Sequence, residues 1–255
     1  MDKAKVKAYF DRIGVEMPAG IVPDAALLRK LQYAHCVTVP YENLDIFRGV
    51  PLSLKTEDLY RKVVENHRGG YCFELNGLFA WLLRELGYQV EEFGSRYLRG
   101  EAAIPFRRHR TLGVTDCAGK RWLVDVGIGD KAPREPILME EALVQEQCGE
   151  TYRLDKDDFL GWVLSDLHHG KWRQFYSFTE EQQLPVDYEP ASFWCEKHPD
   201  SPFIPQEMFS LKTADGRITL DGHLYRVVRD GHIVESRELT DGEMPWGYQQ
   251  FGLKM

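Results

Sequence analysis

The feature that most constrains the fold is a change of pattern near Tyr88. Before this residue, apolar side chains recur at the three- and four-residue spacing of helices. After it, short β-prone runs alternate with turn residues, and hairpin signals stand at Asp221-Gly222 and Asp230-Gly231. We therefore expect an α+β fold in which a helical N-terminal part is followed by antiparallel β structure.

Three helices are predicted in the N-terminal part. The first contains Leu27 to Leu31, and the second starts after residues 53–56. The third follows Gly69-Gly70 and ends before Gly87, where a C-terminal glycine cap belongs. Expected strands include 111–115, 122–126, 162–164, 172–176, 217–220, 224–228 and 232–235. A proline-rich stretch, residues 185–205, is expected to be loop and to separate the middle β unit from the last one.

Composition excludes several classes of protein. The chain has 255 residues with 43% hydrophobic and 28% charged side chains, which is ordinary for a globular protein. Its net charge is −8 without a long basic block, so nucleic acid is not expected as a partner. No apolar run approaches the roughly 18 residues of a membrane span, and the charged N-terminus lacks the apolar core of a signal peptide. We expect no membrane association.

The five cysteines are Cys36, Cys72, Cys117, Cys148 and Cys195, and they form no CxxC pair. An odd number of cysteines, without the close spacing of a small disulfide-bonded secreted protein, favours a reducing compartment. A cytoplasmic protein is therefore expected. Cys72 differs from the others because it falls in the first turn of the third predicted helix. Unpaired N–H groups and the positive end of the helix dipole favour a thiolate there. The alternative is a small buried apolar residue, the usual role of a free cysteine.

A nucleophilic cysteine requires a base, and the base an orienting group. His109 and Asp125 lie on the two arms of a predicted hairpin whose turn is 116–119. A three- or five-residue loop that pairs Thr115 with Gly119, or Val114 with Lys120, would place His109 directly opposite Asp125. A loop of even length would place them on opposite faces. A carboxylate between Val124 and Val126 is costly to bury unless it is paired, which favours the histidine contact.

Motifs for other chemistries are absent from the sequence. It contains no HExxH, no GxGxxG after a strand and no Walker sequence. His168-His169 adjoin a glycine in a predicted turn and point apart, so they are a poor metal pair. No metal cofactor is expected.

The segment from Arg68 to Asn76, RGGYCFELN, resembles the arylamine N-acetyltransferase family. Further matches follow in the family's order, from about Tyr9 to Glu235. They are Arg12-Ile13-Gly14, Val39-Pro40-Tyr41-Glu42-Asn43-Leu44, His109, Asp125-Val126-Gly127-Ile128-Gly129 and His198-Pro199-Asp200-Ser201-Pro202-Phe203.

The resemblance implies a Cys-His-Asp triad at Cys72, His109 and Asp125 on a cysteine-protease-like core. It implies three units: a helical bundle over 1–88 with the nucleophile, an antiparallel β-barrel over 89–190 with the histidine and aspartate, and a C-terminal α/β lid over 191–255. The implied reaction is ping-pong acetyl transfer from acetyl-CoA, through acetyl-Cys72, to an arylamine or arylhydrazine, with a role in xenobiotic metabolism.

The resemblance also implies a substrate pocket at Tyr41, Gly127, Ile128, Gly129 and Phe203. The two glycines would lie close to the thioester arm of CoA. Many family members have phenylalanine where this chain has Tyr41 and Ile128, so we expect a different set of amines to fit. Many relatives also continue beyond Met255 with a helical segment.

Two questions stay open on sequence alone. An amide synthase or a thioester or amide hydrolase would use the same triad, although papain-type enzymes place the histidine some 130 residues after the cysteine. Arg107, Arg108 and Arg110 are a local basic cluster that could face the CoA phosphates or simply be solvated.

Overall fold

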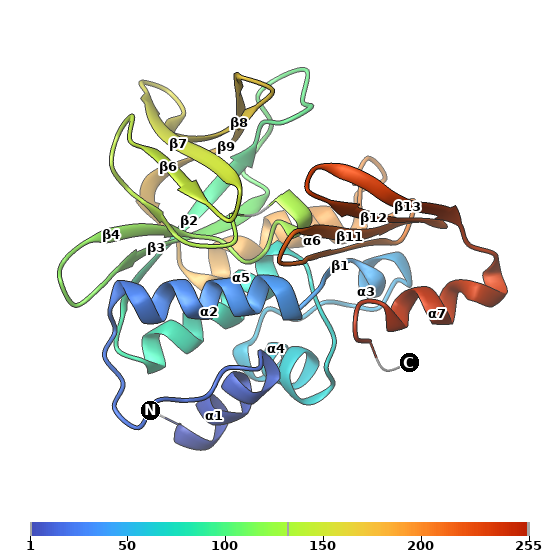
Figure 1. Ribbon diagram of the computed structural model, residues 1–255, viewed down its shortest axis with the longest axis horizontal. Coiled ribbons are helices and arrows are strands. Elements are labelled where there is room, and N and C mark those ends of the chain that lie inside the picture. The colour runs from blue at the N-terminus through green and yellow to red at the C-terminus, as the bar shows by residue number, and fades with distance from the viewer. Residues whose placement is uncertain (1, 132, 254–255) are drawn as a thin grey trace.

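The computed structural model describes residues 2–131 and 133–253, and it places the helical part below a β-barrel with a second sheet beside it (Figure 1). The N-terminal helices are α1 (Lys3–Arg12), α2 (Ala25–Thr38), α3 (Leu44–Phe47), α4 (Thr56–Tyr60), which continues as the π-helical turn η1 (Arg61–Glu65), and α5 (Cys72–Glu85). The three predicted helices are confirmed as α2, α4 with η1, and α5.

Helix α5 forms the centre of the helical part. Eleven of its residues are buried, from Cys72 to Leu83, because apolar side chains cover most of its circumference. Its apolar residues share one hydrophobic core with α1, α2, α4 and the strands β3 and β4. The nucleophile candidate therefore stands at the end of a helix that is fixed by packing on several sides.

The middle of the chain forms an eight-stranded antiparallel sheet in the order β5-β4-β3-β2-β9-β8-β7-β6. Its strands are β2 (Gln89–Tyr97), β3 (His109–Thr115), β4 (Arg121–Val124), β5 (Ile137–Leu138), β6 (Val144–Gln147), β7 (Glu150–Asp157), β8 (Gly161–His168) and β9 (Lys171–Gln182). A short 3₁₀ turn, η2 (Gly129–Lys131), follows β4.

Side chains close this sheet into a barrel where its first and last strands meet. The Gln145 amide accepts from the Leu138 N–H at 2.8 Å and donates to the Leu138 carbonyl at 3.0 Å. Gln147 makes the same pair of bonds to the backbone of Glu135, at 2.5 and 2.9 Å. Two glutamines on β6 thus satisfy backbone groups beside β5 that would otherwise form an open edge.

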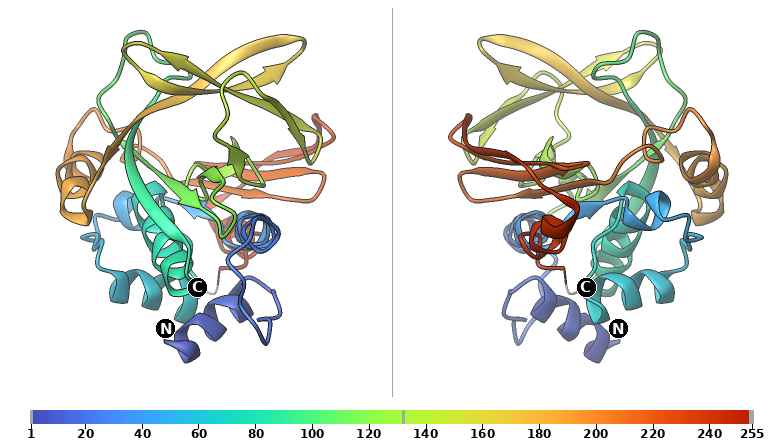
Figure 2. Two further views of the ribbon diagram at one scale, coloured as in Figure 1. Left: turned by 90° about the vertical axis from the view of Figure 1, so that its left-hand side faces the viewer. Right: turned by 90° about the vertical axis from the view of Figure 1, so that its right-hand side faces the viewer.

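The second sheet has the order β1-β10-β11-β12-β13 and lies beside the barrel in all views (Figures 1 and 2). Its strands are β1 (Tyr41–Glu42), β10 (Met208–Lys212), β11 (Gly216–Asp221), β12 (Leu224–Arg229) and β13 (His232–Glu238). Both predicted hairpin turns are confirmed. Asp230 and Gly231 have φ of +46° and +78°, which suits a two-residue turn with both central residues left-handed.

The sequence analysis missed two features of this region. Strand β1 comes from the helical part of the sequence, yet it pairs with β10 through Tyr41 and Ser210. The stretch predicted as loop instead contains η3 (Pro185–Tyr188) and α6 (Glu189–Lys197). Proline did not prevent these helices because Pro185 and Pro190 occupy first-turn positions, which need no N–H donor. Beyond β13, the turn η4 (Asp241–Glu243) leads into α7 (Met244–Gln249), which packs on the same sheet.

Candidate active site

Cys72 owes its position at the start of α5 to the loop that precedes it. A Cβ on Gly69 would lie 2.1 Å from the carbonyl oxygen of Pro40, so this backbone contact admits only glycine. Tyr71 donates its N–H to Oε2 of Glu74 at 3.1 Å, which caps the helix. These local contacts make Cys72 the first helical residue.

A cluster of buried charges holds this loop in place. Lys62 contacts Asp45 and Glu74, both at 2.7 Å, and Arg68 contacts Glu42 at 2.8 Å and Asp45 at 3.0 Å. Burial lowers the pKa of Lys62, but the neighbouring carboxylates outweigh it and raise that pKa. The charges therefore compensate one another, and the loop before Cys72 is rigid.

The His109–Asp125 contact is present, although the predicted register was wrong. Thr115 pairs with Arg121, not with Gly119, so every partner on β4 is shifted by two residues. Asp116 causes the shift, because its carboxylate accepts from the N–H groups of Ala118 and Lys120 and fixes a five-residue loop. A shift of two preserves the face of the sheet. Nε2 of His109 lies 2.7 Å from Oδ2 of Asp125, and both side chains are buried.

Asn76 completes this arrangement, and the sequence analysis gave it no role. Its Nδ2 donates to Oδ1 of Asp125 at 2.9 Å and to the Arg110 carbonyl at 2.6 Å, and its Oδ1 accepts from Val126 N–H at 2.9 Å. Oδ1 of Asp125 also accepts from Gly127 N–H at 2.9 Å. The available signal was its spacing: Asn76 follows Cys72 by one helical turn and lies on the same face of α5.

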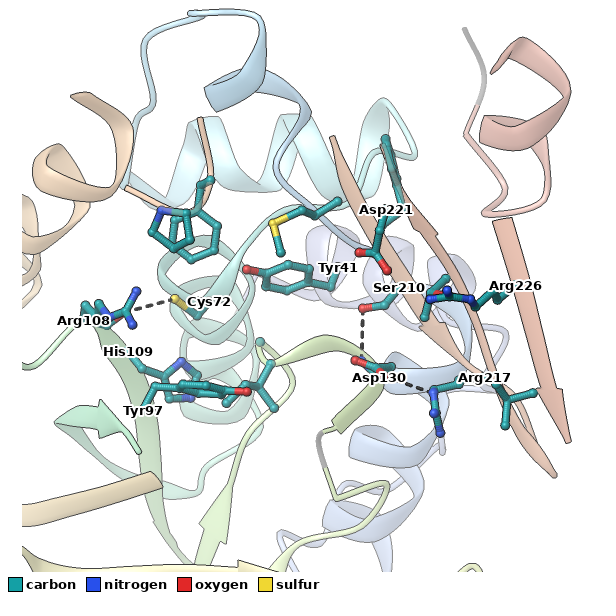
Figure 3. Close-up of a pocket in the computed structure, with 18 of the residues that line it drawn as sticks. Tyr41, Cys72, Tyr97, Arg108, His109, Asp130, Ser210, Arg217, Asp221 and Arg226 are labelled. Atoms are coloured by element: carbon teal, nitrogen blue, oxygen red, sulfur yellow. Dashed lines mark hydrogen bonds and ion pairs between the residues drawn. The ribbon is translucent and has the colours of Figure 1, made fainter. Parts of the chain in front are cut away.

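Cys72 and His109 line one cavity of about 480 Å³ between the helical part, the barrel and the second sheet (Figure 3). Of the predicted pocket residues, Tyr41, Gly127, Ile128 and Phe203 line it as well. Gly129 is not among the residues that line the cavity; it packs beside it, where an added Cβ would be 2.2 Å from Oγ of Ser210 and 3.2 Å from Tyr41.

The wall opposite Cys72 is the polar face of the second sheet, which sequence reasoning missed. It presents Ser210, Arg217, Thr219 and Arg226 to the cavity, and Arg217 contacts Asp130 at 3.1 Å. These residues share one face because they pair across β10, β11 and β12. No pattern in the sequence indicated that this face turns toward Cys72.

The basic cluster at 107–110 divides by position. Arg108 lines the cavity and contacts Glu101, whereas the half-buried Arg107 points elsewhere and reaches Glu181 at 2.6 Å. Arg110 is buried against Glu92. Of the three, Arg108 is the one whose side chain faces the site.

Comparison with known proteins decides the family. A family model described as N-acetyltransferase matches residues 24–255. The arylamine N-acetyltransferase of Mycobacterium tuberculosis is 38% identical over 235 residues, covering 90% of this chain and 82% of that protein. The Escherichia coli enzyme is 36% identical over 251 residues, covering 96% and 87%.

This chain belongs to the arylamine N-acetyltransferase family. Solved structures of arylamine N-acetyltransferases have the same fold as this chain. That of the Salmonella typhimurium enzyme superposes with a TM-score of 0.92 at 32% identity, covering 98% of this chain and 91% of that one. The Mycobacterium marinum enzyme, solved in complex with CoA, gives 0.88 at 33% identity, covering 97% and 92%. The predicted fold, with helical part, barrel and second sheet, is therefore confirmed as that of an arylamine N-acetyltransferase.

The environment of Cys72 in this acetyltransferase differs from the sequence expectation in one respect. Burial raises the pKa of the thiol well above its usual value, and the neighbouring Cys195 and Asp125 add to this effect. The backbone groups of Arg110 and Phe73 act in the opposite direction through hydrogen bonds. The helix terminus alone does not offset the effect of burial, so a thiolate at Cys72 would need a cationic partner.

The structure describes residues 2–131 and 133–253 of this acetyltransferase. No group of three or more His, Cys, Asp or Glu side chains is placed to hold a metal ion there. None of the helices in that part of the chain is long and apolar enough to cross a membrane.

Proposed function

We propose that this acetyltransferase moves the acetyl group of acetyl-CoA to an arylamine or arylhydrazine in two half-reactions through acetyl-Cys72. The observation that supports the proposal best is the buried 2.7 Å contact between His109 and Asp125 at the wall of the cavity onto which Cys72 opens. A nucleophile, a base and an orienting carboxylate at one cavity are the arrangement that covalent acyl transfer requires.

The contact with Asp125 assigns the roles of the two imidazole nitrogens. Nε2 of His109 donates to the carboxylate, so Nδ1 is free to take the proton of the Cys72 thiol. The resulting imidazolium offsets the upward effect of burial on the pKa of Cys72, because an adjacent positive charge favours the thiolate. Thiolate and imidazolium therefore form together, as an ion pair.

The first half-reaction is attack of the Cys72 thiolate on the acetyl carbonyl carbon. The new C–S bond to Cys72 forms, the C–S bond to CoA breaks, and the CoA thiolate takes the proton from His109. In the second half-reaction, the acceptor nitrogen attacks acetyl-Cys72 and gives its proton to His109 as the Cys72 thiolate leaves. The donor leaves before the acceptor reacts, which predicts ping-pong kinetics.

The donor and the acceptor class rest on the family. CoA is present in the structure of the Mycobacterium marinum enzyme, and the relatives carry the name arylamine N-acetyltransferase. Tyr41, Ile128 and Phe203 line the cavity with apolar surface suited to an aromatic ring. The five cysteines are free, which suits a reducing compartment, and we place the enzyme in the cytoplasm.

The deciding experiment combines mass spectrometry with product analysis. Incubation with acetyl-CoA should add one acetyl group to the peptide that contains Cys72, and Cys72→Ala should remain unmodified. Release of CoA is then followed with arylamines, with hydrazines and with water alone. Fast release in water would identify a hydrolase instead, and an unmodified wild-type chain would refute the acetyl-enzyme.

A further inference from the structure

A second buried cysteine lies behind the proposed nucleophile. Cys195, on α6, is 0% exposed, and it belongs to the same buried cluster as Cys72, which is 4% exposed. The other three cysteines lie elsewhere: Cys36 is buried in the core of the helical part, and Cys117 and Cys148 are exposed.

Helix α6 is fixed against the start of α5 by direct contacts. The hydroxyl groups of Tyr71 and Ser192 are hydrogen bonded, and the rings of Phe73 and Tyr188 lie 5.6 Å apart. Ser192 and Cys195 are three residues apart and therefore lie on one face of α6. The residue before Cys72 and the residue after it are thus both held by the segment that carries Cys195.

Electrostatics connect the two thiols of this cluster as well. After burial, the charge of Cys195 has the largest upward effect on the pKa of Cys72, ahead of the Asp125 carboxylate. Cys195 is thus part of the surroundings of the Cys72 sulfur. Its thiol stays protonated at neutral pH, since burial raises the pKa of Cys195 to about 12.

The two thiols differ in their access to small molecules. Cys72 opens onto the 480 Å³ cavity and has a base available in His109, whereas Cys195 is not among the residues that line it. A hydroperoxide entering the cavity therefore meets Cys72 first. A sulfenic acid formed there would have a thiol beside it, in the packed cluster behind the cavity.

We propose that Cys195 is a resolving cysteine, which converts oxidised Cys72 into a reversible Cys72–Cys195 disulfide and protects the nucleophile from further oxidation. In the first step, the Cys72 thiolate attacks a peroxide oxygen. An S–O bond forms, the O–O bond breaks, and sulfur loses two electrons to the peroxide, which leaves as water or alcohol after protonation. In the second step, the Cys195 sulfur attacks the Cys72 sulfur, an S–S bond forms, and water leaves with the thiol proton.

The test uses hydrogen peroxide on the full chain, followed by tryptic digestion without reductant. Cleavage after arginine and lysine releases Cys72 in residues 69–84 and Cys195 in residues 174–197, and each of the other cysteines in a different peptide. We expect these two peptides to be linked, activity to fall as the link forms, and dithiothreitol to restore both. Wild-type Cys72 that accumulates as sulfinic acid without the link would overturn the proposal.

Two variants sharpen the test. In Cys195→Ala, peroxide should drive Cys72 to sulfinic acid, and dithiothreitol should no longer restore activity; in Cys117→Ala, an exposed control, reversibility should be unchanged. If Cys195→Ala does not fold, peptide mapping of the wild type decides alone. The inference rests on the proposed function in requiring a reactive Cys72, so each sample is also labelled with acetyl-CoA. Acetylation without disulfide formation refutes only the resolving role, whereas no acetylation refutes the proposed function.

Discussion

At the scale of single residues, the site depends on how one carboxylate is held. Asp125 uses Oδ1 for Asn76 and for the N–H of Gly127, and this leaves Oδ2 directed at His109. A Cβ on Gly127 would lie 2.7 Å from both Cys72 Cα and Asn76 Nδ2, so the chain after Asp125 packs directly on α5. Helix α5, which carries the proposed nucleophile, therefore positions Asp125 as well.

The first prediction concerns Asn76. Asn76→Ala removes one partner of Asp125 and leaves the buried N–H of Val126 and carbonyl of Arg110 without their bonds. A loss of about 1–3 kcal/mol of transition-state stabilisation lowers kcat/KM by about 5- to 150-fold, which is the expected range.

The pH dependence of Cys72 alkylation distinguishes a role of Asn76 in positioning Asp125 and His109 from a general loss of stability. In Asn76→Ala the profile should shift, because Asp125 keeps only the N–H of Gly127 as a partner for Oδ1 and holds His109 less firmly. Gln32→Ala, which also removes a buried amide that donates to a backbone carbonyl, should leave the profile in place. An unshifted profile in Asn76→Ala would show that Asn76 has only a structural role.

A second residue-scale prediction concerns His35, which is buried and bonded to the Tyr9 hydroxyl at 2.7 Å. Burial, with the charge of Arg12, lowers the pKa of His35 to about 3. Between that value and the ordinary 6.5, the unfolded chain binds the proton and the folded chain does not, so stability rises with pH across this window. Between pH 7 and pH 5, this effect lowers the free energy of unfolding by about 2 kcal/mol.

Urea unfolding at pH 7 and pH 5 measures this contribution. His35→Gln should reduce the difference in unfolding free energy between the two pH values by about that amount. The exposed His232→Gln serves as the matched control and should keep the wild-type difference. An equal pH dependence in all three proteins would contradict a neutral buried His35.

At the scale of elements, the sequence predicts those features that depend on residues close together in the chain. The helices follow from apolar spacing, and the hairpin turns at 221–222 and 230–231 follow from short turn motifs. The β3–β4 register failed by two residues because it depends on the Asp116 side chain, which no residue pattern reveals. The pairing of β1 with β10 joins Tyr41 to Ser210, and no local signal links segments so far apart.

The same distinction applies to the site. Cys72, His109 and Asp125 could be chosen because the motif and the hairpin are short-range features. The polar wall of β10 to β12 could not, since it depends on how the second sheet docks against the barrel.

The barrel closure gives a prediction at this scale. Gln145→Ala removes both bonds to the backbone of Leu138 and leaves part of the β5 edge unpaired. The free energy of unfolding should fall by about 1–3 kcal/mol. The adjacent Glu146→Ala, whose side chain is exposed, should change it by less than about 0.5 kcal/mol. Equal stability of Gln145→Ala and Glu146→Ala in urea unfolding would argue against closure by side chains.

At the scale of the whole molecule, one buried cluster joins the barrel to the second sheet. Glu150, on β7, accepts from Lys212 on β10 at 2.7 and 3.0 Å and from Arg134 at 2.7 Å. Arg134 also donates to the backbone carbonyls of Thr213 and Gly216, at 3.0 and 2.9 Å. The cavity lies beside both units, so this cluster helps to hold the polar wall in place opposite Cys72.

The two cations of this cluster are more deeply buried than Glu150, so substitutions of its members should differ in their effect on the free energy of unfolding. Lys212 and Arg134 are 2% and 3% exposed, and burial lowers the pKa of Lys212. Glu150→Ala leaves two buried cations without their carboxylate partner and should lower the free energy of unfolding by about 3–5 kcal/mol. Lys212→Met removes a buried charge, while Glu150 keeps Arg134 as a partner, so the loss should be clearly smaller.

Loss of this cluster should also change KM, which a lower folding stability alone would not do. Loosening the second sheet moves Ser210, Thr219 and Arg226, which face the cavity, but leaves the contact between His109 and Asp125 intact. In Glu150→Ala, at a temperature where the chain is folded, KM should rise more than kcat falls. The exposed Glu146→Ala again serves as the control. A fall in kcat with unchanged KM would mean that the cluster acts on the catalytic residues and not on the substrate wall.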